Sequence, residues 1–255
     1  MTPSISNTSM AFLVFFVFIP MLLSYLYALK VEKEIIWASI RGSVQLFAIG
    51  YVLTYLFSLP PGYGISMMLF VMITVAVLNA SKRGEGLPQV RLKAFLTLFS
   101  IEALVLSMWL IFDMVSFQAE EVIPMSGMVI GNSMVAIGLA LERLKNEFTE
   151  GKGRILAALS LGASPKDASK IIVRKTLRAA MLPNIDGLKT IGLVQLPGMM
   201  TGLILGGVSP IDAIRYQLVI SLSIFSSVTL SAMFITGMMY QSFFNKDIQL
   251  LEHDE

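Results

Sequence analysis

Cysteine is absent from the 255-residue sequence, and histidine occurs once, at His253. Disulfides, thiolate metal sites and cysteine nucleophiles are therefore excluded. We interpret His253, in an acidic chain end, as a solvated side chain, which excludes histidine chemistry within a membrane. The Gly-x-x-x-x-Gly-Lys-Ser/Thr, Gly-x-Ser-x-Gly and His-Glu-x-x-His motifs are also missing. The sequence thus indicates neither an enzyme nor a chain that binds ATP in a P-loop.

Charge is scarce as well. Only 14% of the residues are charged, whereas a soluble domain has about 25%. Apolar residues make up 55% of the chain, and the mean hydropathy is +0.75. Repeated apolar runs of about twenty residues are typical of α-helical membrane proteins. The net charge of +2 gives no basic surface for nucleic acid, so we expect one transmembrane domain over residues 1–255 and no nucleic-acid partner.

The apolar runs predict seven transmembrane helices. They lie at about 10–29, 35–57, 65–80, 94–112, 123–141, 185–207 and 215–240. Of the 19 Lys and Arg residues, 17 fall after the first, third and fifth runs or in the C-terminal tail, if Arg41 is counted with the first loop, and none follows the second or fourth. The positive-inside rule then predicts an outer N-terminus and a cytoplasmic C-terminus in a cytoplasmic (inner or plasma) membrane.

A polar segment at 142–183 interrupts the apolar pattern, and its centre predicts a helix, a tight turn and a second helix. Gly162 suits the left-handed position that follows a helix end. Ser164 is a good N-cap, and Pro165 fits the first helical position. Asp167 stands three residues after the cap, as in a capping box. The sequence therefore predicts an ordered helix–turn–helix, rather than an irregular loop, between the fifth and sixth apolar runs.

The second of these helices carries a basic stripe. Its members recur at every fourth residue and are Lys166, Lys170, Arg174 and Arg178. We expect Pro183 to end this helix. One interpretation is a loop held at the inner membrane surface by anionic lipid. The other is a docking element for a cytoplasmic partner, which the helix–turn–helix pattern favours.

Several polar groups are expected at membrane depth. Glu102 is a candidate for a transport pathway because a charged side chain in a membrane is costly unless it is protonated, paired or facing water; the alternative is a protonated carboxyl bonded to a neighbouring helix. We expect Asn132 to bond between helices. Asp186 and Lys189 are expected to pair at the cytoplasmic boundary.

The sixth apolar run contains an expected break at Pro197-Gly198, where freed carbonyl groups would face a pathway. Further pathway candidates here are Gln195, Met199 and Met200. Two series of glycines at four-residue spacing predict close helix packing: Gly127 and Gly131, then Gly198, Gly202 and Gly206. The 17 methionines are more typical of flexible apolar filler than of soft metal ligands, and no metal-binding residue is identified.

The turn resembles the coupling-helix loop of ABC-transporter permeases. The matching residues are Ala157, Ala158, Gly162, Ala163, Ser164 and Pro165, followed by Leu182-Pro183. Leu156 stands where that pattern has Glu. The resemblance implies that this segment, with Lys166, contacts an ATPase that binds ATP as a separate chain, so no cofactor is expected in this one.

Longer blocks resemble the FetB-type permeases, which are bacterial iron exporters that work with an ATPase called FetA, and their plant relatives in aluminium tolerance. The blocks begin at Arg41, Ile123, Ser160, Gly192 and Ala213, and the block at Gly192 includes Leu-Pro-Gly-Met-Met. The resemblance implies a homodimeric permease for iron or another metal. The alternatives are an ABC permease for a non-metal cargo, a proton-coupled carrier using Glu102, and a membrane scaffold or sensor.

Overall fold

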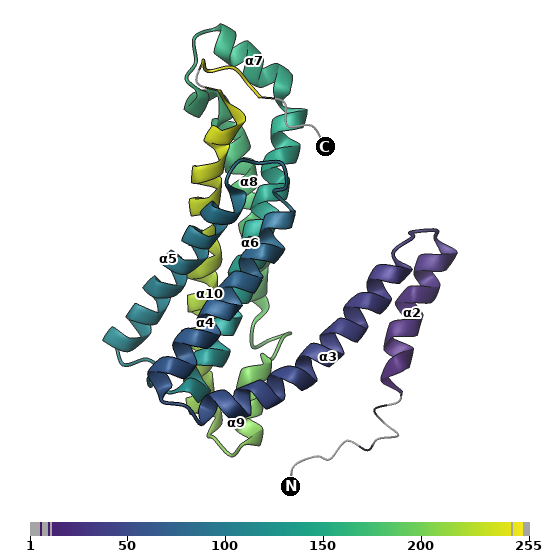
Figure 1. Cartoon of the computed structure of the whole chain (residues 1–255), viewed down its shortest axis with the longest axis vertical. Coiled ribbons are helices and arrows are strands. Elements are labelled where there is room, and N and C mark those ends of the chain that lie inside the picture. The colour runs from purple at the N-terminus through teal and green to yellow at the C-terminus, as the bar shows by residue number, and fades with distance from the viewer. Residues whose placement is uncertain (1–5, 7–9, 11, 246, 252–255) are drawn as a thin grey trace. The chain divides into compact units, whose positions relative to one another are not determined.

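The computed structural model describes residues 6, 10, 12–245 and 247–251, so His253 lies outside the described residues. The chain divides into two compact units, residues 1–60 and residues 61–255. All the named elements are helices, and the described residues contain isolated bridges but no β-strand (Figure 1). The predicted all-α class is confirmed.

The first unit is a helical hairpin formed by α2 (Leu13–Leu26) and α3 (Glu32–Phe57). The hydroxyl of Ser24 donates to Glu32 Oε1 at 2.7 Å and accepts from the Val31 amide at 3.3 Å, which ties the two helices together at the turn. With 14 residues, α2 is only about 21 Å long, less than the roughly 30 Å of a hydrocarbon core. The run predicted at 10–29 therefore contains a helix shorter than expected, whereas α3 is long enough to cross.

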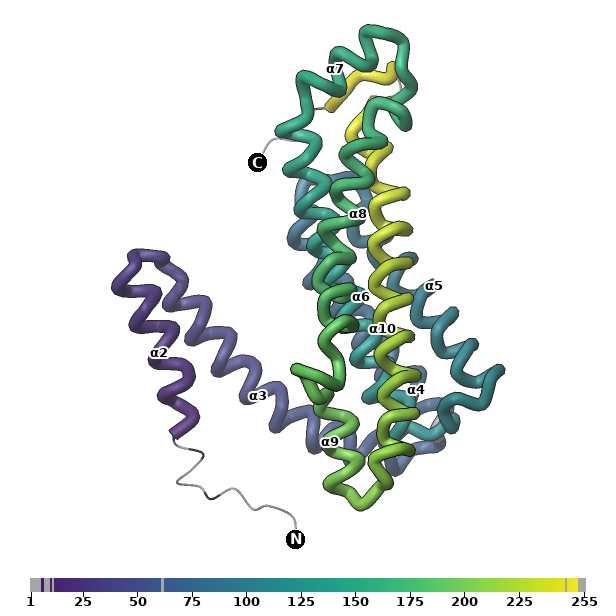
Figure 2. Tube along the Cα trace, turned by 180° about the vertical axis from the view of Figure 1, so that it is seen from behind, coloured from purple at the N-terminus to yellow at the C-terminus, as the bar shows by residue number. Residues whose placement is uncertain are grey.

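The second unit contains the rest of the described elements. They are α4 (Pro61–Lys82), α5 (Val90–Ile111), α6 (Ala119–Glu150), α7 (Lys152–Ser160), α8 (Pro165–Thr190), α9 (Gly198–Leu205), α10 (Pro210–Met239) and the short 3-10 helix η1 (Tyr240–Phe243). Figure 2 shows α6, α8 and α10 side by side, with α7 at one end of this unit and α9 at the other.

The centre of the second unit is α6, which packs against α4, α8 and α10. Its buried residues recur at spacings of three and four, which defines one long face that meets its neighbours. Small buried residues on α6 and α10 let the two backbones approach closely. They are Ser126, Ser133, Ala136 and Ala140 on α6, and Ser227, Ser231 and Ala232 on α10.

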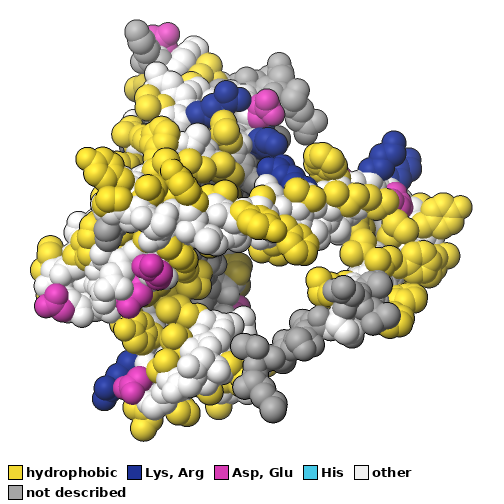
Figure 3. Space-filling model, turned by 60° about the horizontal axis from the view of Figure 1, so that its bottom comes forward, with side chains coloured by type: hydrophobic (Ala, Val, Ile, Leu, Met, Phe, Trp, Pro, Cys, Tyr) yellow, Lys and Arg dark blue, Asp and Glu magenta, His cyan; other side chains and the backbone are white. Residues whose placement is uncertain are grey.

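Five helices are long and apolar enough to cross a membrane: Glu32–Phe57, Gly62–Lys82, Val90–Ile111, Ala119–Glu150 and Pro210–Phe243. Hydrophobic side chains cover much of the surface seen in Figure 3, with charged groups confined to a few places. Such a surface is typical of a chain solvated by lipid, so the structure and the sequence agree on a multi-pass membrane protein.

The sixth predicted crossing, at 185–207, is not a single helix. The prediction that Pro183 ends the preceding helix is wrong, because α8 runs from Pro165 through Pro183 to Thr190. Proline removes the bond to the carbonyl of residue 179, but one missing bond does not end a helix that is supported by packing. The helix is interrupted later, between Thr190 and the short α9.

The end of the second unit around α7 is held by aromatic packing. The ring of Phe148 stacks on that of Phe243 with centroids 4.1 Å apart and meets Phe244 edge-on at 5.9 Å. Ile155 of α7 and Ile172 of α8 are fully buried in the same cluster. The polar segment at 142–183 is thus part of the folded core.

We expect Phe148→Ala to lower the free energy of unfolding by about 3–5 kcal/mol, because it removes a buried ring and leaves a cavity. Thermal unfolding in detergent micelles measures the loss. Phe234→Ala is the matched control, since Phe234 is half exposed on α10 and should change stability much less. Equal effects of the two substitutions would contradict the role of the stack.

Candidate functional site

The turn between α7 and α8 has the predicted backbone. Gly162 adopts φ +85°, in the left-handed region that favours glycine. Its amide donates to the Leu159 carbonyl at 2.9 Å, and the Ala163 amide donates to that of Ala158 at 3.0 Å. These bonds satisfy carbonyl groups that the end of α7 would otherwise leave unpaired. The predicted helix end is confirmed.

The start of α8 is also as predicted. Ser164 has extended backbone, and its hydroxyl accepts from the Asp167 amide at 3.2 Å and donates to Asp167 Oδ2 at 2.6 Å. Pro165 occupies the first helical position. Because the carboxylate and the cap bind each other, the direction in which α8 leaves the turn is fixed locally.

The turn presents an exposed surface. Leu161 is 89% exposed, and Ala157, Gly162, Ser164 and Lys166 are exposed with it, while Ala158, Ala163 and Pro165 are half-buried. All four members of the basic stripe on α8 are exposed, and none forms an ion pair within the described residues. The exposed Leu161 and the exposed basic stripe together form a surface that suits the binding of a partner protein.

This surface is fixed to the rest of the second unit. Lys175 of α8 forms an ion pair with Glu147 of α6 at 3.0 Å. The loop between α4 and α5 is bound to α6 as well, because Arg83 pairs with Glu142 at 2.8 Å and Lys145 donates to the Glu85 carbonyl at 2.9 Å. The Lys- and Arg-rich loop between α4 and α5 and the Lys- and Arg-rich segment that follows α6 therefore lie at the same end of the second unit.

The other end of α8 is a break in the helix next to α9, far from α7 (Figures 1 and 2). The amides of Leu193 and Val194 both donate to the Thr190 carbonyl, at 3.2 and 3.0 Å. Gly192, with φ +80°, donates to the Gln195 carbonyl at 2.9 Å. The chain then passes through extended backbone at Pro197 into α9. The predicted interruption is confirmed, although it begins seven residues before Pro197.

The pathway candidates around this break are not buried. Gln195 and Gly198 are exposed, and Pro197, Met199 and Met200 are half-buried. The packing predicted for Gly198 and Gly202 is not made within the described chain, because a side chain at either position would meet open space. Leu193 and Val194, which precede Gln195, are also highly exposed. This face of the second unit is therefore uncovered in the isolated chain.

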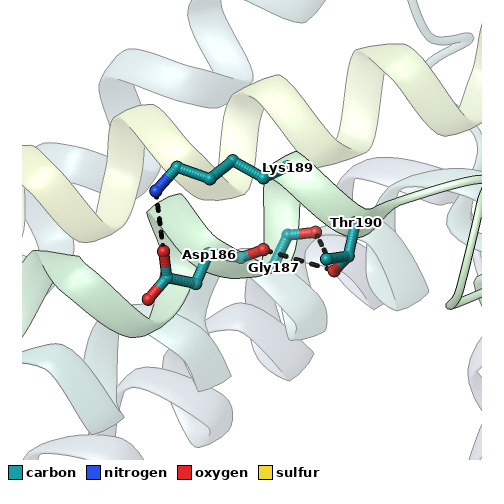
Figure 4. A network of polar contacts seen from close by, with 4 residues as sticks. All are labelled: Asp186, Gly187, Lys189 and Thr190. Atoms are coloured by element: carbon teal, nitrogen blue, oxygen red, sulfur yellow. Dashed lines mark hydrogen bonds and ion pairs between the residues drawn. The ribbon is translucent and has the colours of Figure 1, made fainter.

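A charged pair lies just before the break. Lys189 Nζ is 2.9 Å from Asp186 Oδ1, and the Thr190 hydroxyl donates to the carbonyls of Asp186 and Gly187 at 3.2 Å (Figure 4). The pairing of Asp186 with Lys189 is as predicted. Both side chains are open, with 59% of Asp186 and 67% of Lys189 exposed.

The depth of this pair follows from the ion pair between Lys175 and Glu147. Asp186 is eleven residues further along α8, which corresponds to about 16 Å. The antiparallel α6 reaches the same level near residue 136, within the apolar run at 123–141. The pair therefore lies level with the apolar part of α6, because α8 continues through Pro183. Its position at the cytoplasmic boundary stays a prediction.

Glu102 lies inside the second unit, 3% exposed on α5. The Ser126 side chain is beside it, but neither carboxyl oxygen has a hydrogen-bond partner within the described residues. Asn132 is exposed, and its amide group donates to the Met128 carbonyl of its own helix at 2.8 Å. In the described chain Asn132 therefore makes no bond to a neighbouring helix.

A groove of about 300 Å³ lies between α4 and α6. Three methionines line it, Met68, Met72 and Met134, together with Gly127 and Gly131. A Cβ at Gly127 would lie 3.4 Å from Met72 Cε, an ordinary van der Waals contact, and a Cβ at Gly131 would meet open space. The close packing predicted for these two glycines is therefore not made within the described chain. The described residues hold no cluster of three His, Cys, Asp or Glu side chains that suits a metal ion.

The fold and these surfaces define a multi-pass helical membrane protein with a helix–turn–helix at one end and a broken helix within its apolar length. The model of the uncharacterised protein family UPF0014 matches residues 7–244, and the chain belongs to this family.

Among its relatives is the probable iron export permease protein FetB of Escherichia coli, 36% identical over 97% of this chain and 96% of the relative. YjkA, a UPF0014 membrane protein of Bacillus subtilis, is 38% identical over 96% and 98%. Protein ALUMINUM SENSITIVE 3 of Arabidopsis thaliana is 32% identical over 93% and 87%. No solved structure matches this chain significantly. The resemblance drawn from the sequence is confirmed at the level of the family.

We expect Ser164→Ala to destabilise the first turn of α8 by about 0.5–2 kcal/mol, because it removes the cap. Amide hydrogen exchange of residues 166–168 measures the effect as faster exchange. Ser160→Ala is the control, since the Ser160 hydroxyl only donates to the Leu156 carbonyl within α7. If the exchange of α8 stays unchanged, the capping bond does not stabilise the turn.

Proposed function

We propose that this chain is the membrane-spanning subunit of an ABC transporter that exports iron or another metal ion. ATP is bound and hydrolysed by a separate ATPase subunit, which docks on the turn at Leu161–Ser164 and on the basic stripe of α8. The name of the relative from Escherichia coli, probable iron export permease protein FetB, supports both the permease role and iron as cargo.

The observation that carries this proposal is the continuity of α8. One helix of 26 residues begins at the exposed turn and ends at the break within the apolar length. A helix of this length is rigid enough to move as one body, so a displacement at the turn reaches Thr190, about 39 Å away. A docking surface connected to a break at membrane depth is the arrangement that energy coupling requires.

The distribution of charge supports a cytoplasmic position for the turn. The end that carries α7 holds the Lys- and Arg-rich segments, whereas the loop between α5 and α6 and the first turn of α6 carry Asp113, Glu120 and Glu121 without a cation. The positive-inside rule then places α7 and the C-terminus in the cytoplasm, with the N-terminus outside. In this proposal α8 and α9 together form one broken crossing, which makes seven crossings with α2, α3, α4, α5, α6 and α10.

The exposed pair at Asp186 and Lys189 supports a homodimer. Charged side chains at this depth do not face lipid, since insertion of one costs about 2.5 kcal/mol or more. A second copy that faces the same surface of α8 and α9 would enclose it and leave a water-filled pathway between the two subunits. Anionic lipid would occupy the outer part of the basic stripe at the membrane surface.

Glu102 favours a second candidate, a proton-coupled carrier that works without an ATPase. A buried carboxyl without a partner is the group that such a carrier would use as a relay. This candidate predicts flux in the absence of ATP and its loss in Glu102→Gln. A membrane scaffold, as a third class, predicts no flux at all.

Membrane vesicles that contain this chain, with and without its ATPase, distinguish these functions. We expect ATP-dependent movement of ferrous iron that needs both proteins and fails with a hydrolysis-dead ATPase. If the ATPase binds and hydrolyses ATP without moving iron, the permease assignment remains and the cargo is not iron. Flux without the ATPase would identify the carrier, and the absence of both flux and ATPase binding would identify the scaffold.

We expect Gly162→Val to abolish ATP-driven transport while the ATPase continues to hydrolyse ATP. A β-branched residue does not adopt φ +85°, so the turn must change its shape and lose its fit to the partner. Gly153→Val is the matched control, because Gly153 lies in the helical α7 with open space around it. Coupled transport by the Gly162 variant would remove the turn from the mechanism.

A further inference from the structure

The interior of the second unit holds an acidic group that no cation within the described residues pairs with. Glu102 is buried on α5, and the Ser126 side chain of α6 lies beside it. Neither carboxyl oxygen of Glu102 nor the Ser126 hydroxyl has a hydrogen-bond partner within the described part of the chain. An ionised carboxylate in such a place is costly, so this group needs a positive charge.

Two hydrogen bonds show which part of α10 lies at the level of Glu102. Trp109 Nε1 of α5 donates to Ser223 Oγ of α10 at 2.8 Å, and Lys93 Nζ at the start of α5 donates to the Met238 carbonyl at 3.0 Å. The two packed helices are therefore antiparallel. Glu102 precedes Trp109 by seven residues, or two turns, so it lies on the same face as Trp109 and level with about residue 230 of α10.

The polar groups that α6 and α10 bring to this level are hydroxyls. Ser227 and Ser231, on either side of residue 230, are fully buried. The Ser227 hydroxyl donates to a carbonyl of its own helix, whereas the Ser231 hydroxyl has no partner among the described residues. Hydroxyls can bond to a carboxyl group in either protonation state, but they carry no charge to balance a carboxylate.

The helices that pack against α5 also bring no charged side chain to this level. These helices are α4, α6 and α10. Apart from Glu102, the sequence has no Asp, Glu, Lys, Arg, His or Tyr at 64–81 of α4, 94–111 of α5, 122–141 of α6 or 217–239 of α10. The titratable groups of all four helices therefore lie near the helix ends, and none of them faces Glu102.

A proton suits this place better than a metal ion does. Hard divalent cations take about six or more oxygen ligands, commonly with several carboxylates or waters among them. The interior around Glu102 offers one carboxyl group and a few hydroxyls, and it is closed to solvent. A proton balances the single negative charge and needs no coordination shell.

We propose that Glu102 is a proton-binding site enclosed by α5, α6 and α10. The carboxyl group is protonated while the three helices are packed together, and it releases the proton when they separate and water reaches it. Proton binding and helix packing therefore stabilise each other. The site is independent of the proposed function, because it needs neither an ATPase nor a cargo.

The direction of the pH effect follows from which state binds the proton more tightly. The enclosed carboxyl has no water to solvate a negative charge, whereas separated helices admit water. The packed state therefore binds the proton more tightly, and a rise in pH favours the separated state. Glu102→Gln keeps the shape and the neutral charge of the protonated group, so packing in this variant should not respond to pH through this position.

The absence of cysteine makes it possible to follow this opening with a single introduced thiol. Ser133 lies two turns after Ser126 on the same side of α6, and it is buried. Ser133→Cys therefore places a thiol that reacts with a water-soluble maleimide when water enters between the helices. The rate is measured on the full-length chain in lipid nanodiscs over roughly pH 6 to 8, within the range in which buried carboxyl groups can exchange their proton.

Each rate is divided by the rate of the same reporter combined with Glu102→Gln, because the thiolate is the reactive form and its population also depends on pH. We expect this ratio to rise with pH by up to about tenfold per pH unit, the limit for release of one proton. Glu120→Gln is the matched control, since Glu120 is an exposed acid on the reporter's own helix, and it should leave the pH dependence unchanged. A constant ratio overturns the proposal, and so does an equal loss of pH dependence in the control.

Infrared spectroscopy of the wild-type chain tests the protonation itself. The carbonyl stretch of a protonated carboxyl group should be present at neutral pH and absent from Glu102→Gln. A carboxylate signal from Glu102 in the packed chain would show that another cation, rather than a proton, balances the charge, and it would overturn the site. If Glu102→Gln does not fold, Glu102→Met, which is similar in volume and uncharged, replaces it in both measurements.

Discussion

The structure depends on one constraint, which is that lipid supplies no hydrogen bonds. Every backbone group and every charge at membrane depth needs a partner within the protein or in enclosed water. The helices around α6 meet this requirement through their own backbone bonds and through close packing of small residues. The break after Thr190 does not meet it within one chain. The open Asp186–Lys189 pair beside it therefore requires a polar surrounding.

The functions proposed for this chain depend on α8, which connects the turn at its start to the break at its end. At one end a capped turn is held against α6 by the Lys175–Glu147 pair and by the cluster around Phe148. At the other end the helix stops inside the apolar length of the unit. A partner that moves the turn would alter the environment of the break, because both belong to one helix.

Much of the local structure was predictable from the sequence, because it depends on neighbouring residues. Gly162, Ser164 and Asp167 predict the turn, because a positive φ and the hydrogen bonds of a hydroxyl and a carboxylate depend only on residues a few positions away. The apolar runs predict long helices, since about twenty such residues fit the thickness of a membrane. The family was evident for the same reason, because its blocks are contiguous in sequence.

The sequence by itself determined the helical membrane class, the capped turn and the presence of a break near Pro197. The tertiary structure alone decided where the break begins and which part of α6 lies beside Asp186, because those depend on whether packing against α6 carries α8 through Pro183. It also decided that Glu102 is buried without a hydrogen bond to any described residue, whereas Asn132 bonds its own helix, since burial and partners are set by elements distant in sequence. Residue patterns indicate the conformation that each segment prefers locally. Tertiary packing determines where the folded chain departs from that preference, as it does at Pro183.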